Sequence, residues 1–212
     1  MPAPGKRLHA PSVSTRRRVI DAALVAFARR GYDVTSLDSL AAELGITKQT
    51  ILYYFPSKEA LLEVVVDDVA ADVYAALMDA QVDGGAWQKV RGVVRSVFSI
   101  AGRRPELLGL VREVARLGPP AATRLAGHLS PLIDKATAYL ELAMDLGELR
   151  RQDARLLLLT SYSTVVGMVT EGEVLRTLGL DSSARSLVRQ RSAALSFLQA
   201  ALTPACTGSS AA

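Results

Sequence analysis

Residues Thr35–Phe55, TSLDSLAAELGITKQTILYYF, decide how the rest of the chain is interpreted. Leucine and alanine recur at helical spacing over residues 37–44, which predicts a short helix with one apolar face. Thr35 is placed to cap the start of this helix. Gly45 follows its last apolar residue, where a left-handed backbone commonly ends a helix.

A second short helix is predicted directly after this turn. Thr47 is placed to cap it, and it runs to about Tyr54. Ile51 and Phe55 lie four residues apart, so both are expected to face the core. Two helices joined by a Gly-containing turn form a helix-turn-helix, whose second helix lies in the major groove when the motif binds DNA.

The polar side chains left on the outside of the second helix match the chemistry of nucleotides. Lys48 can donate to guanine acceptors, and Gln49 can pair with adenine through one donor and one acceptor. Thr50 offers a hydroxyl and a methyl to base edges, whereas tyrosine hydroxyls and a lysine at the next helix start suit phosphates. We predict DNA contacts for Thr35, Ser36, Thr47, Lys48, Gln49, Thr50, Tyr53, Tyr54 and Lys58.

Positive charge gathers around this motif. Residues 1–60 hold nine basic side chains against five acidic ones, and the other 152 residues hold 16 of each. The whole net charge of +4 therefore lies beside the helix-turn-helix, as a polyanionic partner requires. The alternative interpretation is a polar, solvated surface without a ligand, which accounts for the charge but not for its location.

The N-terminal part of the chain, about a quarter of it, resembles the DNA-binding domain of the TetR family of bacterial transcriptional regulators. This sequence has Leu52 where the family often has tyrosine, and Tyr54 where it often has histidine. Phosphate contacts implied by the family therefore carry over to Tyr53 and Tyr54, with the choice between them open. The residues that carry the resemblance are Ala22, Phe27, Gly31, Tyr32, Thr35, Leu40, Ala41, Gly45, Ile46, Thr47, Thr50, Tyr53, Phe55, Ser57, Lys58 and Leu61.

The remaining chain predicts further helices and no clear strand, because alanine and leucine are abundant and alternating β-branched runs are missing. We therefore expect an all-α protein with an N-terminal three-helix helix-turn-helix DNA-binding domain and a larger C-terminal helical domain. The expected parts are a flexible basic arm (1–14), the DNA-binding domain (15–60), a ligand-binding and dimerisation domain (61–202) and a flexible tail (203–212).

Two final helices are predicted at about 152–178 and 183–202. The earlier one is apolar on nearly every side over Leu156–Val169, so all of its faces should be buried. Packing one side inward and the other against a second subunit achieves this. The family resemblance likewise implies a homodimer formed through the last two helices.

The resemblance also implies a small-molecule effector pocket in the C-terminal domain. The composition there favours a mostly apolar ligand with one or two polar anchors, for which Glu113 and Tyr162 are suited. Simple core packing is the alternative role for every residue of the set. The predicted lining residues are Trp87, Phe98, Leu110, Glu113, Val114, Tyr139, Leu140, Met144, Tyr162 and Met168.

Other classes of function find little support in the sequence. One cysteine and two histidines far apart predict no metal site and no disulfide within the chain, and we expect no cofactor. Catalytic motifs are missing, so an enzyme is not expected. The first residues carry no apolar signal core, and the longest apolar run, Leu156–Val169, is too short to span a membrane. We expect a cytoplasmic protein.

Together these patterns predict a ligand-responsive transcriptional regulator that binds double-stranded DNA at a roughly palindromic operator. We expect a repressor that a small, mostly apolar molecule releases from DNA, although an activator would share every residue considered. The alternative from another class is a helical dimer that binds a ligand or partner and uses its helix-turn-helix only as scaffold.

Overall fold

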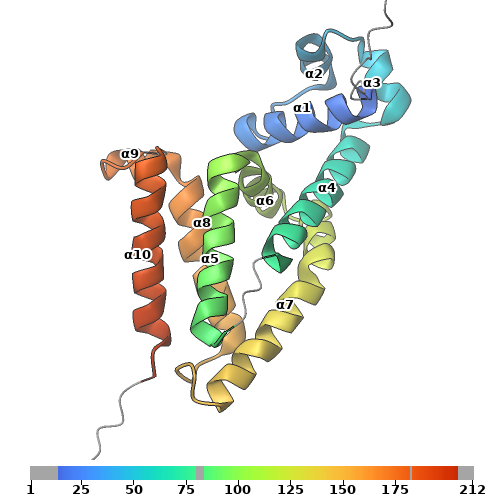
Figure 1. The fold of residues 1–212 in the computed structure, drawn as a ribbon. Coiled ribbons are helices and arrows are strands. Elements are labelled where there is room, and N and C mark those ends of the chain that lie inside the picture. The colour runs from blue at the N-terminus through green and yellow to red at the C-terminus, as the bar shows by residue number, and fades with distance from the viewer. Residues whose placement is uncertain (1–13, 80–83, 182, 205–212) are drawn as a thin grey trace, which may run out of the picture. The chain divides into compact units, whose positions relative to one another are not determined.

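The computed structural model describes residues 14–79, 84–181 and 183–204, and the regular structure of these residues is entirely α-helical (Figure 1). This confirms the predicted all-α fold. The chain divides between Val65 and Val66 into two compact units, called unit 1 and unit 2 below. The helices are α1 (Thr15–Arg30), α2 (Leu37–Leu44), α3 (Lys48–Tyr54), α4 (Lys58–Met78), α5 (Ala86–Arg103), α6 (Pro105–Leu117), α7 (Ala121–Asp145), α8 (Ala154–Thr170), α9 (Gly172–Thr177) and α10 (Ala184–Leu202).

Unit 1 is a three-helix bundle followed by the first turns of α4. Helix α1 packs against both α2 and α3, which also pack against each other. The apolar faces predicted from helical spacing meet in the core, so the expected inward orientation of the α3 residues is confirmed. The largest side chains buried there are Phe27, Leu40, Ile51 and Phe55.

Local signals in the sequence set the ends of these helices. Gly45 ends α2 in the left-handed conformation, with φ 66° and ψ 35°, as its position predicts. The Thr47 hydroxyl caps α3 by accepting from the Thr50 N–H at 3.2 Å, which is also as predicted.

The cap of α2 was predicted one residue too early. Ser36 is the N-cap, and its hydroxyl accepts from the Ser39 N–H at 3.0 Å. The Ser39 hydroxyl accepts from the Ser36 N–H in return at 3.2 Å, which completes a capping box. Thr35 instead donates its hydroxyl to the Gly31 carbonyl at 2.8 Å and is 1% exposed. The burial of Thr35 leaves the next hydroxyl, that of Ser36, to cap the helix.

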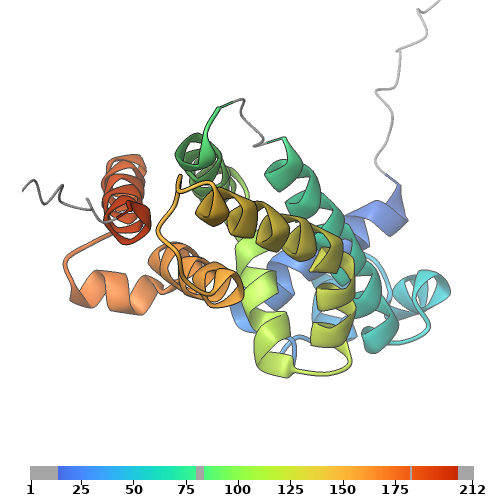
Figure 2. The same ribbon diagram turned by 90° about the horizontal axis from the view of Figure 1, so that it is seen from below.

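Unit 2 is built around α5, α8 and α10, which lie alongside one another and pack in all three pairs (Figure 1). Helices α6 and α7 pack against each other and against α8, which Figure 2 shows from below. Apolar side chains from α5, α7, α8 and α10 form one continuous core. Its buried members include Val94, Phe98, Leu140, Met144, Leu157, Val165, Ala194 and Leu198.

The single helix predicted at about 152–178 is wrong, because the structure has two helices there. Helix α8 ends at Thr170, and α9 begins at Gly172 after Glu171 leaves the helical conformation with ψ 61°. Arg112 of α6 holds the break: it donates to the Thr170 carbonyl at 3.2 Å and pairs with the Glu171 carboxylate at 2.9 Å. Glycine is also a poor helix former, which weakens the helix at this point.

Helix α4 runs without interruption from unit 1 into unit 2. Its start is capped by Ser57, whose hydroxyl accepts from the Ala60 N–H at 3.1 Å. Its 21 residues include no glycine or proline. Helix α4 ends at Met78. Of the predicted arm (1–14) only Ser14 is described, and of the predicted tail (203–212) only Thr203 and Pro204; the other residues of both lie outside the described residues.

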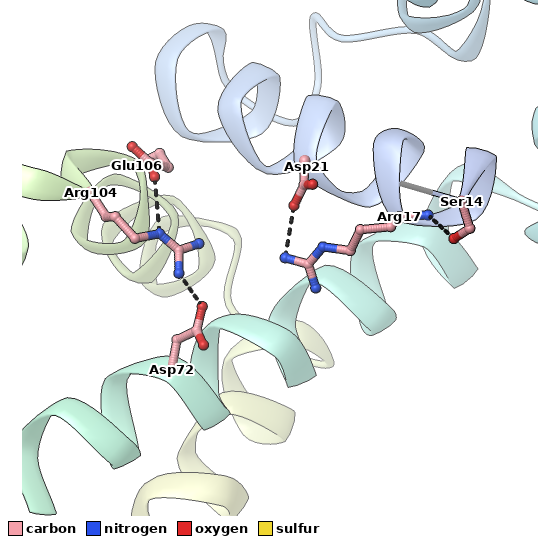
Figure 3. Close-up of polar contacts among 6 residues, drawn as sticks. All are labelled: Ser14, Arg17, Asp21, Asp72, Arg104 and Glu106. Carbon is pink, nitrogen blue, oxygen red and sulfur yellow. Dashed lines mark hydrogen bonds and ion pairs between the residues drawn. The ribbon is translucent and has the colours of Figure 1, made fainter. Parts of the chain in front are cut away.

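Two carboxylates on the unit 2 part of α4 form ion pairs with arginines outside that helix. Asp67 receives two hydrogen bonds from Arg124 of α7, at 2.6 and 2.7 Å, and lies 2.8 Å from the His128 ring nitrogen. Asp72 accepts from Arg104 at 2.6 Å, close to the start of α6 (Figure 3). Unit 2 therefore holds this part of α4 by charged contacts in addition to apolar burial.

Candidate nucleic-acid interface

The outer face of α3 is polar and exposed. Lys48 and Gln49 lie in its first turn, and Tyr53 in its last turn is 82% exposed. The Tyr53 and Tyr54 rings meet edge to face, with centroids 5.0 Å apart. Ile51 on the opposite side is fully buried, so the core fixes which residues α3 presents to solvent.

The hydroxyl residues predicted for this surface mostly hold the local fold. Thr47 is exposed, but its hydroxyl caps α3 and lies 2.9 Å from the hydroxyl of Thr50. Ser36 is exposed and caps α2. Thr35 is removed from the predicted DNA contacts, because its buried hydroxyl is occupied by the Gly31 carbonyl.

Lys58, at the first residue of α4, is held against an aromatic ring. Its ammonium lies 4.1 Å from the centroid of the Tyr32 ring, in a cation–π contact. The Tyr32 hydroxyl donates to the Glu59 carboxylate at 3.1 Å. Burial, reinforced by that hydrogen bond, raises the pKa of Tyr32 to about 12. The Tyr32 ring thus holds the Lys58 ammonium against unit 1.

Lys48 has a partner that sequence reasoning missed. Its ammonium forms an ion pair with the Asp38 carboxylate of α2, with 2.8 Å between nitrogen and oxygen. The two residues are ten apart in sequence and lie on opposite sides of the turn. The usual spacing signals for ion pairs cover three or four residues within one helix, so no such signal reveals this contact.

The arginines at the start of α1 also contact unit 1 itself. Arg17 pairs with Asp21 at 2.7 Å, and its backbone N–H donates to Ser14 (Figure 3). Arg18 donates to the Leu44 carbonyl at 3.0 Å and so ties α1 to the end of α2. Arg16 lies 5.3 Å from the centroid of the Phe55 ring. These contacts position positive charge close to both helices of the motif.

The predicted effector residues of unit 2 are mostly part of its core. Phe98, Leu140 and Met144 are buried in the main cluster, and Leu110 and Val114 are buried on α6. Trp87, Tyr139 and Met168 are partly buried against the same cluster.

The two predicted polar anchors have different surroundings. Glu113 is largely buried and pairs with Arg116 at 2.8 Å. Tyr162 is partly exposed on α8, and burial raises the pKa of its hydroxyl.

One surface depression of unit 2 has a volume of about 250 Å³ and lies beside the end of α7. Met144 is the only predicted effector residue among those that line it. The lining residues are Glu141, Met144, Asp145, Arg151 and Gln152. Within the described residues, no group of three or more metal-ligating side chains comes together, and none of the helices is both long and apolar enough to cross a membrane.

Fold and surface together define a helix-turn-helix protein with a second, larger helical unit. Residues 19–65 match the family model described as bacterial regulatory proteins, tetR family. The HTH-type transcriptional regulator RutR of Escherichia coli K12 is 30% identical over 137 residues, which are 64% of this chain and 64% of RutR. The chain thus matches less than two thirds of the length of this relative.

Solved structures share the fold over most of the chain. The ketosteroid transcriptional regulator KstR2 of Mycobacterium tuberculosis has a TM-score of 0.71 at 16% identity, over 93% of this chain and 99% of that one. AibR, in complex with isovaleryl coenzyme A and operator DNA, has a TM-score of 0.66 at 19% identity, over 74% and 86% of the two chains. These likenesses show the fold alone. The family model and RutR thus identify residues 19–65 as a domain of the tetR type.

Proposed function

We propose that this protein is a ligand-responsive, DNA-binding transcriptional regulator, and specifically a repressor that a small, mostly apolar molecule releases from its operator. Unit 1 would be the DNA-binding domain, and unit 2 would bind the effector and a second copy of the chain. Support comes from RutR, which is a transcriptional regulator, and from AibR, which binds operator DNA and an acyl coenzyme A.

The observation that carries the proposal is the exposed polar face of α3. Lys48, Gln49 and Tyr53 are presented on a short helix whose start is capped and whose inner side is locked in the core. A helix of this kind enters the major groove with its N-terminal residues at the base edges. In this arrangement Lys48 and Gln49 contact bases, and Tyr53, Tyr54 and Lys58 contact phosphates.

An apolar stripe on unit 2 supports a homodimer through the last helices. Leu156, Leu159 and Tyr162, spaced three residues apart, form the stripe along α8 of the single chain, and α10, which packs beside α8, exposes Val188 and Phe197 on different faces. Side chains of this size seldom gather on the surface of a monomer without a partner. Two copies of α8 and α10 would bury the stripe in a four-helix interface and present two α3 helices to one palindromic operator.

Binding selection from random double-stranded DNA tests the proposal. We expect one preferred, roughly palindromic sequence, because two α3 helices read equivalent half-sites about 34–36 Å apart. Gln49→Ala should weaken binding to that sequence by about 1–3 kcal/mol and relax the preference at one base position of each half-site.

Gln88→Ala is the matched control, since Gln88 is an exposed glutamine of unit 2. It should leave the selected sequence and the affinity unchanged. Recovery of no preferred sequence would refute the proposal and favour the scaffold alternative, a helical dimer that binds a ligand or partner.

A further inference from the structure

We propose that Asp38 is a specificity-determining residue of the α3 surface, because its carboxylate holds the Lys48 ammonium so that Lys48 reads base edges instead of attaching to any phosphate. The inference rests on the proposed DNA-binding function and deepens it. Asp38 acts through Lys48 and is therefore a positioning residue.

The geometry places the carboxylate directly beside the reading helix. Asp38 is in the first turn of α2 and Lys48 is the first residue of α3, with 2.8 Å between Oδ2 and Nζ. The Lys48 side chain is 46% exposed and that of Asp38 is 69% exposed. The pair thus lies on the surface, and the next residue of α3, Gln49, is exposed as well.

Stability does not account for this pair. Ion pairs between exposed side chains contribute little to folding, because water screens the charges and both side chains lose freedom. The start of α2 is already secured by the capping box of Ser36 and Ser39. The start of α3 is capped by Thr47, so neither helix depends on the Asp38–Lys48 contact.

The pair does change what Lys48 can bind. An ammonium has three donors, and the bond to Asp38 uses one of them, which leaves two for a neutral acceptor such as guanine O6 or N7. A phosphate approaching the same ammonium meets the negative carboxylate and is repelled. Asp38 therefore penalises attachment to the DNA backbone more than contact with a base, and a penalty on the wrong ligand is one of the two ways to gain specificity.

Helix α2 offers a matched control. Glu43 is also an exposed acid of α2, and it pairs with Arg30 of α1 instead of a residue of α3. Removing either carboxylate changes the charge of unit 1 equally, so both variants should bind random DNA more tightly. Only the loss of Asp38 should change how the protein distinguishes sequences.

The experiment compares Asp38→Ala and Glu43→Ala in the full chain. Affinity is measured for the selected operator and for a random duplex of equal length, each over a range of salt concentrations. We expect Asp38→Ala to lower the ratio of operator to random affinity by about fivefold or more, with a steeper salt dependence on random DNA. Glu43→Ala should leave the ratio unchanged. Asp38→Asn, which keeps the size of the side chain, repeats the test.

A second arm uses Lys48→Ala as the background. There Asp38→Ala should change the affinity for operator and random DNA by the same factor, because the residue through which Asp38 acts is gone. Two outcomes would overturn the inference even if the wild type prefers an operator. One is a ratio of operator to random affinity that Asp38→Ala leaves unchanged, and the other is a fall in this ratio that persists in the Lys48→Ala background. A wild-type protein without any preferred sequence would overturn the proposed function first.

Discussion

Unit 1 and unit 2 differ in what they leave on their surfaces. Unit 1 buries large apolar residues such as Phe27 and Ile51, and exposes polar side chains with the basic Lys48 along α3. Unit 2 buries a larger apolar core and still leaves leucines and a phenylalanine exposed along α8 and α10. The two surfaces suit different partners. Charge on unit 1 attracts a polyanion, whereas the apolar side chains of unit 2 associate with another apolar surface because this removes both from water.

Charges are also used differently in the two units. In unit 1 the ion pair of Lys48 and Asp38 is on the surface that we propose for DNA. In unit 2 the paired carboxylates Asp67 and Asp72 connect α4 to neighbouring helices. Unit 1 also has an ion pair between helices, that of Arg30 and Glu43, so the pair at α3 is set apart by its place on the proposed DNA surface.

The largest expected effect is on dimerisation, from a substitution in the exposed apolar stripe of α8. Leu159→Glu places a charge in the stripe on α8, where Leu159 is 57% exposed in the single chain. If a second copy covers the stripe, an unpaired charge must lose its water there, so the dimer dissociation constant should rise about 100-fold or more. Analytical ultracentrifugation over a range of protein concentrations measures this.

Leu142→Glu is the control for that substitution, because Leu142 is 55% exposed on α7, outside the stripe. It makes the same change in charge at equal exposure and should leave the dissociation constant as it is. If both variants have the same dimer dissociation constant, or if the wild type is strictly monomeric, a second copy of the chain does not cover the apolar stripe of unit 2.

A smaller effect is expected at the basic edge of unit 1. Lys58→Ala should weaken binding to every DNA sequence alike and reduce the salt slope by about one for each subunit, because a phosphate contact carries no sequence information. Fluorescence anisotropy against operator and random duplexes over a salt series gives both quantities.

Lys89→Ala serves as the comparison for Lys58→Ala. Lys89 of α5 also stacks on a tyrosine, with its ammonium 4.1 Å from the Tyr139 ring centroid, but it belongs to unit 2. Its loss should leave the salt slope as in the wild type. A Lys58 effect confined to the operator would mean that Lys58 reads bases, contrary to the phosphate role.

The smallest effect is expected at the carboxylate pairs of α4. The hydrogen bonds from Arg124, with a lesser contribution from His128, hold the pKa of Asp67 below its ordinary value of 3.8. A lowered pKa in the folded state adds stability above the unfolded pKa, and this stability is lost as pH falls through the folded pKa. Asp67→Asn should therefore cost about 1 kcal/mol or less at pH 7, since the pair is part exposed.

Urea unfolding of wild type and Asp67→Asn at pH 7 and at pH 3 measures this difference. We expect the gap in the free energy of unfolding to narrow in acid, because pH 3 lies below the ordinary carboxyl pKa, so the unfolded wild-type chain gains a proton there that its folded state binds less readily. A gap that stays constant between the two pH values would show that Asp67 contributes through packing instead of charge.

Most of unit 1 could be predicted from the sequence because its signals are local. Gly45, Thr47 and the spacing of Ile51 and Phe55 each act within one or two helical turns. The single misplaced cap arose because Thr35 and Ser36 are both good capping residues. Their sequence does not show that the Thr35 hydroxyl is drawn to the Gly31 carbonyl.

Features that depend on distant residues could not be predicted. The break between α8 and α9 is held by Arg112, which is 59 residues before Glu171 in the chain. The contact between Lys48 and Asp38 spans the turn and has no periodic signature. The DNA contacts and the effector residues stay predictions, and apolar spacing alone cannot separate a pocket wall such as Tyr139 from ordinary core packing.

The uninterrupted course of α4 has a mechanical consequence. A helix of this length is a rod of roughly 30 Å, and this one lacks the glycine or proline that would let it bend sharply. A tilt of about 10° at one end displaces the other by roughly 5 Å, about one helical pitch. Asp67 and Asp72 lie on the same continuous helix as Lys58, so a tilt of α4 at these two ion pairs would be carried along the helix backbone to its first residue.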